Sequence, residues 1–516
     1  MTDPQHDWRL RYMGRPFLTK LLLRRTRMDR HARLQATRLL QQVIDVVEES
    51  LGGEPLPPAQ HDAYIEAICE ALAWSNSHKK QVDDVLALLR PVDASHNGEL
   101  AAPSTVRGRP TSSGGSRSKR WTLTSADLLQ GALVAAVATG DTDRVHALIE
   151  RGALADGDGA LFGSPLASAA RRGLNPMEAI LAQRGASFTP ARGGQYFSPL
   201  IDAAAAGQVA TVRGLLNCAS FEMRCDDPVR TLENGFERAL RFAVGNGHTE
   251  IVTLLVDKLQ TIDLQGLSRF RRAVEDWRKG VIQLAFLDAC RYGRRNLVEL
   301  LLSKGAGLNV SMGPRGTGIH NASRGGHIEI LRLLLDLGAE PVRSAPPSFS
   351  IAQPVCREPI CLAARHDHKH VVQFWLDAGI DIDNRNGMFS PLLEAAFEDQ
   401  ISMVRFLLSR NADLKIKDCG RQALHYAVGQ GFESMVQLLI EHGVDPDGLP
   451  NDIPSEDDET DSEGYSDSDI PMLQAMIRGQ DHIVRLLLRL GAKQVDPAHT
   501  DYADRFKEGF YPRSRA

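Results

Sequence analysis

The sequence lacks the features that mark secreted, membrane-spanning and zinc-binding proteins. Its seven cysteines include no C-x-x-C pair, so neither a zinc ribbon nor a disulfide framework is indicated. No window of about 18 uncharged apolar residues occurs, and the opening MTDPQHDW has no apolar core, so neither a membrane span nor a secretion signal is expected. An intracellular location, cytoplasmic or nuclear, is therefore expected.

The chain also has little excess charge of either sign and few aromatic residues. Its formal net charge is −5, and 6% of its 516 residues are aromatic, whereas 43% are hydrophobic. This composition is too apolar for a disordered chain and lacks the overall positive charge of an obligate nucleic-acid binder. Most of the chain is expected to fold, and any basic surface must be local.

A helix–turn–helix pattern recurs from about residue 125 to residue 493. Its repeat length without insertions is 32 to 34 residues. Four positions before each turn residue stands an alanine, and eight positions after it stands a leucine, except for Trp375. A small alanine allows two helices to pack closely, and a leucine fills the space between neighbouring units. The ten turn residues are Gly140, Gly173, Gly207, Gly247, Gly293, Gly326, Asp367, Asp399, Gly431 and Gly479.

These units resemble the ankyrin repeat, as in GHIEILRLLLDLGAEP from Gly326 and GRQALHYAVGQGFESMVQLLIEHGVDP from Gly420. The resemblance implies an all-α solenoid of about ten helix-loop-helix units over residues 121–493. It also implies a non-enzymatic interaction module or scaffold that binds other proteins on its concave face and hairpin tips. Only His320 and His425 keep the histidine of the family's TPLH motif, which predicts less regular hairpins and the same fold.

The flanks and insertions differ from the repeats. Residues 1–92 have helical patterns and are expected to form a small helical domain or an extended cap, followed by a flexible Ser/Gly/Arg-rich linker over 93–120. An extra helix is expected at 259–279, and residues 494–516 form a C-terminal tail. Insertions are expected near 219–234, 259–279, 342–356 and 448–469, the last of which is strongly acidic.

No catalytic constellation or cofactor motif stands out. The Gly-rich stretch 313–318 lacks the spacing of a phosphate-binding loop. His366, His368 and His370 are close in sequence, but the repeat places them at a turn, which predicts surface histidines and no metal site. No cofactor and no metal are expected.

The ends of the first helices in the middle repeats are the predicted partner-binding surface. Arginine recurs two residues before the turn in three successive units, which predicts an exposed cationic row about 20 Å long that suits an acidic protein segment. Arg171 and Arg172 repeat this arrangement in the second unit. The predicted partner-binding residues are Arg291, Tyr292, Arg324, Arg365, His366, Phe397 and Gln430.

Two alternatives remain open at this point. Residues 8–40 contain ten bases and one acid, so a regulatory nucleic-acid-associated protein is the first alternative, although the charge of the chain makes nucleic acid an unlikely partner. An enzyme with an unrecognised site in residues 1–92 is a weaker one. A monomer is expected. Ser455, Thr460 and Ser466 each precede an acid by three positions and are candidate phosphorylation sites.

Overall fold

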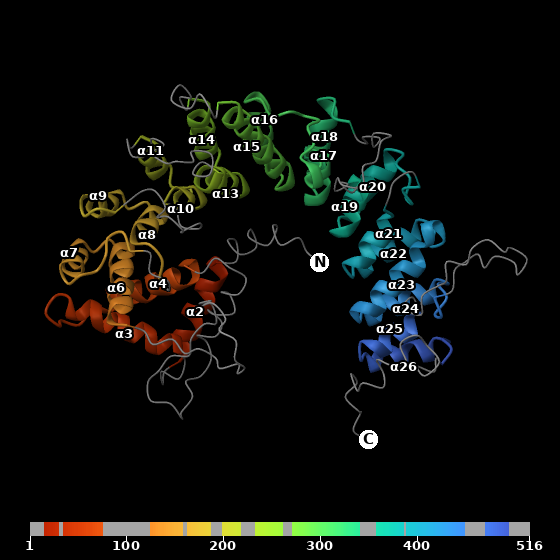
Figure 1. The fold of residues 1–516 in the computed structure, drawn as a ribbon, viewed down its shortest axis with the longest axis horizontal. Coiled ribbons are helices and arrows are strands. Elements are labelled where there is room, and N and C mark those ends of the chain that lie inside the picture. The colour runs from red at the N-terminus through yellow and green to blue at the C-terminus, as the bar shows by residue number, and fades with distance from the viewer. Residues whose placement is uncertain are drawn as a thin grey trace, which may run out of the picture. The chain divides into compact units, whose positions relative to one another are not determined.

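The computed structural model describes residues 15–29, 35–75, 124–157, 162–186, 199–217, 233–261, 271–340, 358–385, 389–448 and 470–494. These residues are helical or in turns, and none of them forms an extended strand (Figure 1). In the described part of the chain, the helices before the repeats are α2 (Arg15–Met28), α3 (Gln35–Glu49) and α4 (Pro58–Ser75).

Ten helix pairs follow within the described residues, and each pair has a first and a second helix. The first helices are α6 (Ser125–Thr139), α8 (Pro165–Arg172), α10 (Pro199–Ala206), α13 (Arg238–Asn246), α15 (Arg271–Arg291), α17 (Gly318–Gly325), α19 (Pro359–Arg365), α21 (Pro391–Phe397), α23 (Cys419–Gln430) and α25 (Pro471–Ile477). The second helices are α7 (Thr142–Glu150), α9 (Asn175–Gln183), α11 (Val209–Asn217), α14 (Thr249–Thr261), α16 (Arg295–Ser303), α18 (Ile328–Asp336), α20 (Lys369–Asp377), α22 (Ile401–Ser409), α24 (Glu433–Glu441) and α26 (Asp481–Arg489). The described residues also include the π-helical segment η2 (Glu233–Glu237) and the 3₁₀ turns η4 (Gly313–Arg315) and η5 (Ile416–Asp418).

The turn residues end the first helices in the same way in all ten pairs. Each has a positive φ, between 54° and 83°, which glycine adopts freely and which aspartate tolerates at Asp367 and Asp399. The N–H of the following residue then donates to the carbonyl of the alanine five positions earlier at 2.9–3.0 Å. This hydrogen bond satisfies a carbonyl that the end of a helix would otherwise leave without a partner.

The alanine and leucine columns form the packing layers, as the sequence predicts. All ten alanines have no exposed surface, and the nine leucines and Trp375 are at most 5% exposed. Trp375 differs because its indole N–H donates to the buried hydroxyl of Ser323 at 3.0 Å. The large side chain at that position thereby satisfies a polar group in the core of the preceding repeat.

Helix starts follow the predicted hydroxyl–proline signal. Ser164 and Ser390 accept hydrogen bonds from the backbone N–H groups of Ala167 and Leu393, at 3.4 and 3.2 Å. In each case proline occupies the first helical position, where its missing N–H costs no intrahelical bond. Ser198, which has the same signal, lies outside the described residues.

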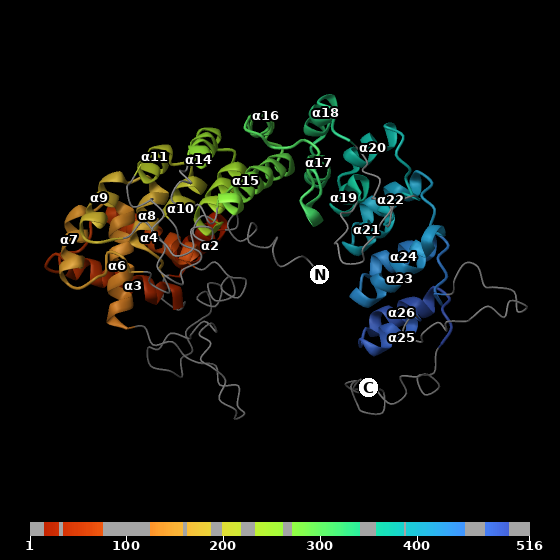
Figure 2. The same ribbon diagram turned by 45° about the horizontal axis from the view of Figure 1, so that its top comes forward.

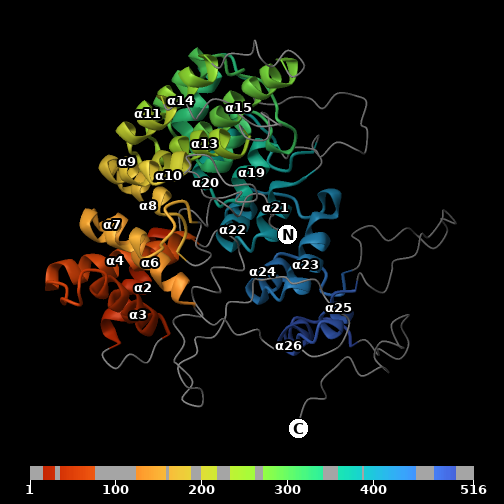
Figure 3. The ribbon, with the colours of Figure 1, turned by 60° about the vertical axis from the view of Figure 1, so that its left-hand side comes forward.

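The chain divides into two compact units, residues 1–278 and 279–516, with the boundary inside α15. In the first unit α4, α6, α8, α10 and α13 succeed one another in one layer, and the second helices lie beside them in another (Figure 3). In the second unit α17, α19, α21, α23 and α25 form the equivalent layer, with α18, α20, α22, α24 and α26 alongside (Figure 2).

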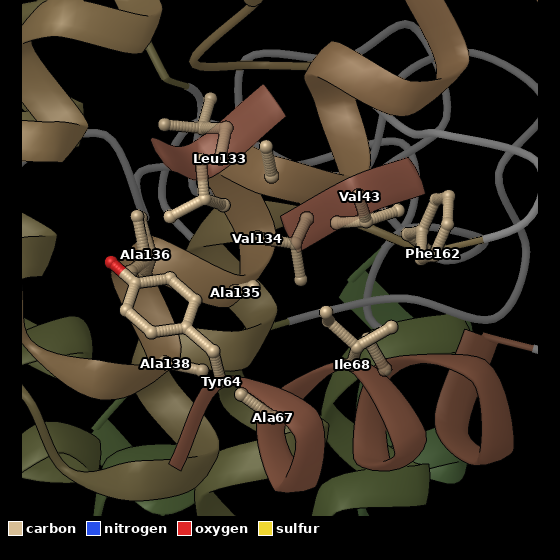
Figure 4. Packing of buried hydrophobic residues seen from close by; sticks show 14 of the residues in the cluster. Val43, Tyr64, Ala67, Ile68, Leu133, Val134, Ala135, Ala136, Ala138 and Phe162 are labelled. Carbon is tan, nitrogen blue, oxygen red and sulfur yellow. The ribbon is translucent and has the colours of Figure 1, made fainter. Parts of the chain in front are cut away.

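The N-terminal helices pack directly on the first repeat. Val43 from α3 and Ile68 from α4 lie with Val134 of α6 in one buried cluster (Figure 4). Tyr64 is 1% exposed in the same cluster, and its hydroxyl donates to Asp141 at 3.1 Å. Residues 35–75 therefore continue the core of the solenoid, which is the arrangement of a cap.

One prediction about the insertions is wrong, and several lie outside the described residues. The extra helix expected at 259–279 is not separate, because Trp277 belongs to α15, which runs without interruption to Arg291. Three of the predicted segments lie outside the described residues: the linker 93–120, the insertion near 342–356 and the acidic stretch 450–469. The structure describes only the last two residues of the 219–234 insertion and only the first residue of the 494–516 tail.

Candidate functional site

The predicted partner-binding residues all belong to the second unit. They lie at the carboxyl ends of α15, α17, α19, α21 and α23, which are successive first helices. Because the turn that follows each helix has the same geometry, the residues just before it occupy equivalent places along the stack. The structure therefore brings these residues to one edge of the first-helix layer.

Histidines after the turns fix the backbone of this edge. His327 Nε2 lies 3.0 Å from the carbonyl oxygen of Arg291, and His368 Nε2 lies 3.0 Å from that of Arg324. His370 Nε2 lies 2.8 Å from the carbonyl oxygen of Gly326. Two of the three closely spaced histidines thus hydrogen-bond the preceding repeat, and no group of metal-ligating side chains occurs among the described residues.

The same hydrogen bond recurs elsewhere in the stack. His248 makes it to Ala205, and the side-chain amides of Gln208 and Gln480 make it to Arg171 and Gly429, at 3.2 to 3.4 Å. Five side chains that directly follow a turn therefore act as clasps to the repeat before them: Gln208, His248, His327, His368 and Gln480. Each such bond contributes about 0.5–1.5 kcal/mol and sets the position of the residue that carries the carbonyl.

Gly325 allows the fifth and sixth repeats to approach closely at this edge. A Cβ atom on Gly325 would lie 2.1 Å from the carbonyl oxygen of Arg291, closer than atoms in contact approach. Other repeats have a side chain at this position, such as Tyr292 and His366. The absence of a side chain at Gly325 lets the two arginine-bearing helix ends come together.

Arg365 is not the exposed cation that the sequence predicts. Its guanidinium donates to Glu394 at 3.0 Å and also pairs with Glu398, and only 19% of its side chain is exposed. The Glu394 side chain has no exposed surface. Arg365 therefore compensates a buried carboxylate of the next repeat, and its main role is structural.

Arg171 and Arg172 in the first unit follow the same rule, which corrects their predicted role. Arg171 pairs with Asp202 of the next repeat at 3.5 Å and with Glu70 of α4 at 3.1 Å. Arg172 also pairs with Glu70. Burial of Glu70 tends to raise its pKa, but the two guanidinium groups outweigh that effect and hold the pKa below its usual value.

A positional rule links these pairs. An arginine two residues before one turn meets an acid five residues before the next turn, as in Arg171 with Asp202 and Arg365 with Glu394. For Arg291 the corresponding residue of the next repeat is Asn321, and for Arg324 it is Leu362. Of the three arginines in the predicted row, the rule therefore describes Arg365.

Electrostatics around His366 agree with positive charge at this edge. The pKa of the His366 imidazole is lowered, first by partial removal from water and then by the guanidinium groups of Arg324 and Arg291. Removal from water is the larger of these two effects. Arg291 and Arg324 are themselves half-buried.

Aromatic side chains follow the arginines along the stack. Phe397, which the sequence predicts as a contact residue, lies with its ring centroid 4.5 Å from that of Tyr426. Tyr426 in turn lies 6.4 Å from Phe432, and all three rings are half-buried. Gln430 is exposed beside them. Sequence reasoning missed Tyr426 and Phe432, although Tyr426 stands at the position that carries Glu394 one repeat earlier.

Other features of the described residues favour no particular chemistry. A cavity of about 550 Å³ lies between the hairpins of the eighth and ninth repeats, and its lining carries both signs of charge, with Arg385, Lys415, Asp413 and Asp445. Within the described ranges, no helix combines the length and apolar character that crossing a bilayer requires. Ser455, Thr460 and Ser466 lie outside those ranges.

The basic segment 8–40 is divided between a core face and a solvent face in its described part. Leu22 and Leu39 are fully buried, whereas Arg24, Arg25 and Arg27 are exposed on α2. Arg27 lies 3.8 Å from a carboxylate oxygen of α4. The nucleic-acid alternative stays a prediction, since exposed arginines on an amphipathic helix also serve as an ordinary solvated face.

Comparisons with known proteins locate the repeats. A family model described as ankyrin repeats (many copies) matches residues 360–408 and 392–440. The ankyrin repeat and KH domain-containing protein CBG24701 of Caenorhabditis briggsae is 28% identical over 160 residues, which cover 30% of this chain and 6% of that protein. Palmitoyltransferase AKR1 of Lachancea kluyveri is 31% identical over 157 residues, covering 30% of this chain and 20% of that protein.

The chain thus matches only a small part of the length of these curated relatives. The crystal structure of the human ASB11 ankyrin repeat domain is 23% identical, covers 47% of this chain and 96% of that chain, and has a TM-score of 0.33. Ankyrin repeats indicate a protein-interaction module, because stacked repeats present an extended binding surface. The family-model match identifies ankyrin repeats at residues 360–440, and the same turn geometry recurs in all ten helix pairs.

Proposed function

We propose that the second unit binds other proteins at the carboxyl ends of its first helices and catalyses no reaction. The observation that carries this proposal is the row of first-helix ends, where arginines and then aromatic rings stand at equivalent places of successive ankyrin-type repeats. Stacked repeats present such a row as an extended surface suited to binding another protein.

The scaffold supports recognition because it is already ordered. The clasps of His327 and His368 hold the backbone at two of the arginines, so little conformational entropy is lost there on binding. The half-buried rings of Phe397, Tyr426 and Phe432 add an apolar surface of the kind that contributes strongly to protein interfaces.

Selective capture of partners tests the proposal. The full-length chain is immobilised and exposed to a lysate of its natural host, and retained proteins are quantified by mass spectrometry. The double variant Arg291→Glu/Arg324→Glu is compared with Arg332→Glu/Arg405→Glu, which makes the same charge change at exposed positions of the second helices α18 and α22. A set of proteins retained by the wild type and the control, and lost from the first variant, is the expected result.

Circular dichroism melts of both variants check that each remains folded. If the two variants retain the same proteins as the wild type, binding does not use Arg291 and Arg324, and the proposed site is wrong.

A further inference from the structure

The tenth repeat leaves open a face that each of the first nine repeats buries. The residue three positions before the turn residue has no exposed surface in the first nine helix pairs. These nine residues are Val137, Ala170, Ala204, Val244, Cys290, Ser323, Ala364, Ala396 and Val428. In the tenth pair the same position carries Met476 on α25, and this residue is only half-buried.

A second position in the repeat shows the same change. The residue five positions after the turn residue is at most 9% exposed in the first nine pairs, from Val145 to Val436, whereas Val484 in the tenth is half-buried. Leu488, four residues further along α26, is 43% exposed, although its counterpart Ile440 is half-buried. Both positions therefore face the next repeat, and no further described helix follows α26 (Figure 2).

Met476, Val484 and Leu488 together form what we call the open face. In the preceding repeats the equivalent surface receives the next first helix, as where α21 contacts α23 and α23 contacts α25. Apolar surface left in water is unfavourable, and repeat arrays need an element that covers their last repeat. The expected occupant of the open face is therefore a helix with apolar side chains on one side.

The segment that follows α26 in the sequence has the pattern of such an occupant, TDYADRFKEGF from Thr500. Tyr502 and Phe506 are four residues apart, which places them on one face of a helix. Threonine is a favoured residue directly before a helix, and Gly509 is a favoured residue directly after one. The sequence therefore predicts a short amphipathic helix between Thr500 and Gly509.

This predicted helix stands where the next first helix would stand in the chain. In the preceding repeats α21 begins 14 residues after the end of α20, and α23 begins 10 residues after the end of α22. Asp501, the first residue of the predicted helix, comes 12 residues after the end of α26 at Arg489. Arg485 on α26 is exposed, and the segment carries three acids that complement its charge: Asp501, Asp504 and Glu508.

We propose that residues 500–510 form a helix that covers the open face and caps the stack, with Tyr502 and Phe506 against it. Arg505 stands four residues before Gly509, where the repeats have their buried alanine, so the segment is a cap and not an eleventh repeat. A short connection to α26 gives the segment an effective concentration on the order of millimolar, which favours it over a separate molecule. The proposal is independent of the proposed function.

Photo-crosslinking in the full-length protein tests which segment covers the open face. Leu488 is replaced by the photoreactive residue benzoylphenylalanine, and the cross-linked peptides are identified by mass spectrometry after irradiation. The matched control places the same residue at Leu337, a leucine after α18 that is 52% exposed. Cross-links from position 488 to residues 500–510 of the same chain are expected, at a yield on the order of tenfold above that from position 337.

Hydrogen exchange of the full-length protein gives a second, independent measure. Backbone amides in residues 500–510 should exchange on the order of tenfold more slowly than in a synthetic peptide of residues 495–516, because a docked helix protects them. Val484→Asp should remove this protection, and Arg405→Asp, at an exposed position of α22, should keep it. Phe506→Ser should also remove it and leaves the repeats unaltered, so the test does not depend on how well Val484→Asp folds.

Cross-links from position 488 to a second chain would assign the open face to another copy of the protein and overturn the proposal. An absence of cross-links to residues 500–510 overturns it as well, and so do amides in that segment that exchange as fast as in the peptide. None of these results affects the proposed function, which the capture of host proteins by the Arg291→Glu/Arg324→Glu variant tests separately.

Discussion

Replacing Arg365 by leucine should destabilise the second unit strongly, although the sequence alone suggests an exposed position where leucine would be harmless. The guanidinium compensates Glu394, whose side chain has no exposed surface. Removing one partner of a buried ion pair costs about 3–5 kcal/mol, because the remaining charge stays buried without compensation. The second pair, with the half-exposed Glu398, adds little.

The matched control is Arg405→Leu on α22, where the arginine is exposed and the expected change is within about 0.5 kcal/mol. Thermal unfolding of the full chain followed by circular dichroism should show a midpoint on the order of 10 °C lower for Arg365→Leu. Urea unfolding of the same proteins gives an independent measure of the loss.

A second substitution isolates the cause. Adding Glu394→Leu to Arg365→Leu removes the buried charge, so stability should return most of the way to that of the wild type. Equal unfolding midpoints for Arg365→Leu and Arg405→Leu would show that the pairing of Arg365 with Glu394 does not stabilise the fold. A double variant that is no more stable than Arg365→Leu would lead to the same conclusion, and the structural role assigned to Arg365 would be wrong.

Four further changes test other parts of the argument. Glu70→Gln should lower stability at pH 7, and the difference from wild type should shrink as pH falls below about 4 in acid-unfolding curves, because the lowered pKa of Glu70 gives stability that is lost on protonation. Gly325→Ala should cost about 1–3 kcal/mol in urea unfolding, because its Cβ meets a backbone carbonyl of the preceding repeat, whereas Gly214→Ala, with nothing within 4 Å, should be neutral or stabilising. Burial and a nearby arginine lower the pKa of His320 to about 4, so its contribution is full above about pH 6.5 and falls toward pH 4; His320→Gln should flatten that part of the stability profile, and an unchanged slope would contradict the assignment. Ala363→Leu should overpack the close helix contact and cost about 1–3 kcal/mol in thermal melts, and a neutral result would show that the repeat register is misplaced.

The repeat architecture is readable from the sequence because its determinants are local. A glycine or aspartate with positive φ, an alanine four residues before it and a leucine eight after it lie within one helix pair. Each such residue acts through its own backbone conformation or its own size, so its effect depends little on distant parts of the chain. The same locality places Arg291, Tyr292, Arg324, Arg365 and His366 at one edge of the stack.

The roles of those residues were decided only by tertiary structure. Whether an arginine at this edge pairs with the next repeat depends on the residue about 30 positions later, as Arg365 with Glu394 and Arg171 with Asp202 demonstrate. The pairing of Glu70 with Arg171 and Arg172 spans about a hundred residues. Charge compensation depends on distance in space and on burial, and a linear pattern specifies neither of these until the repeats are stacked.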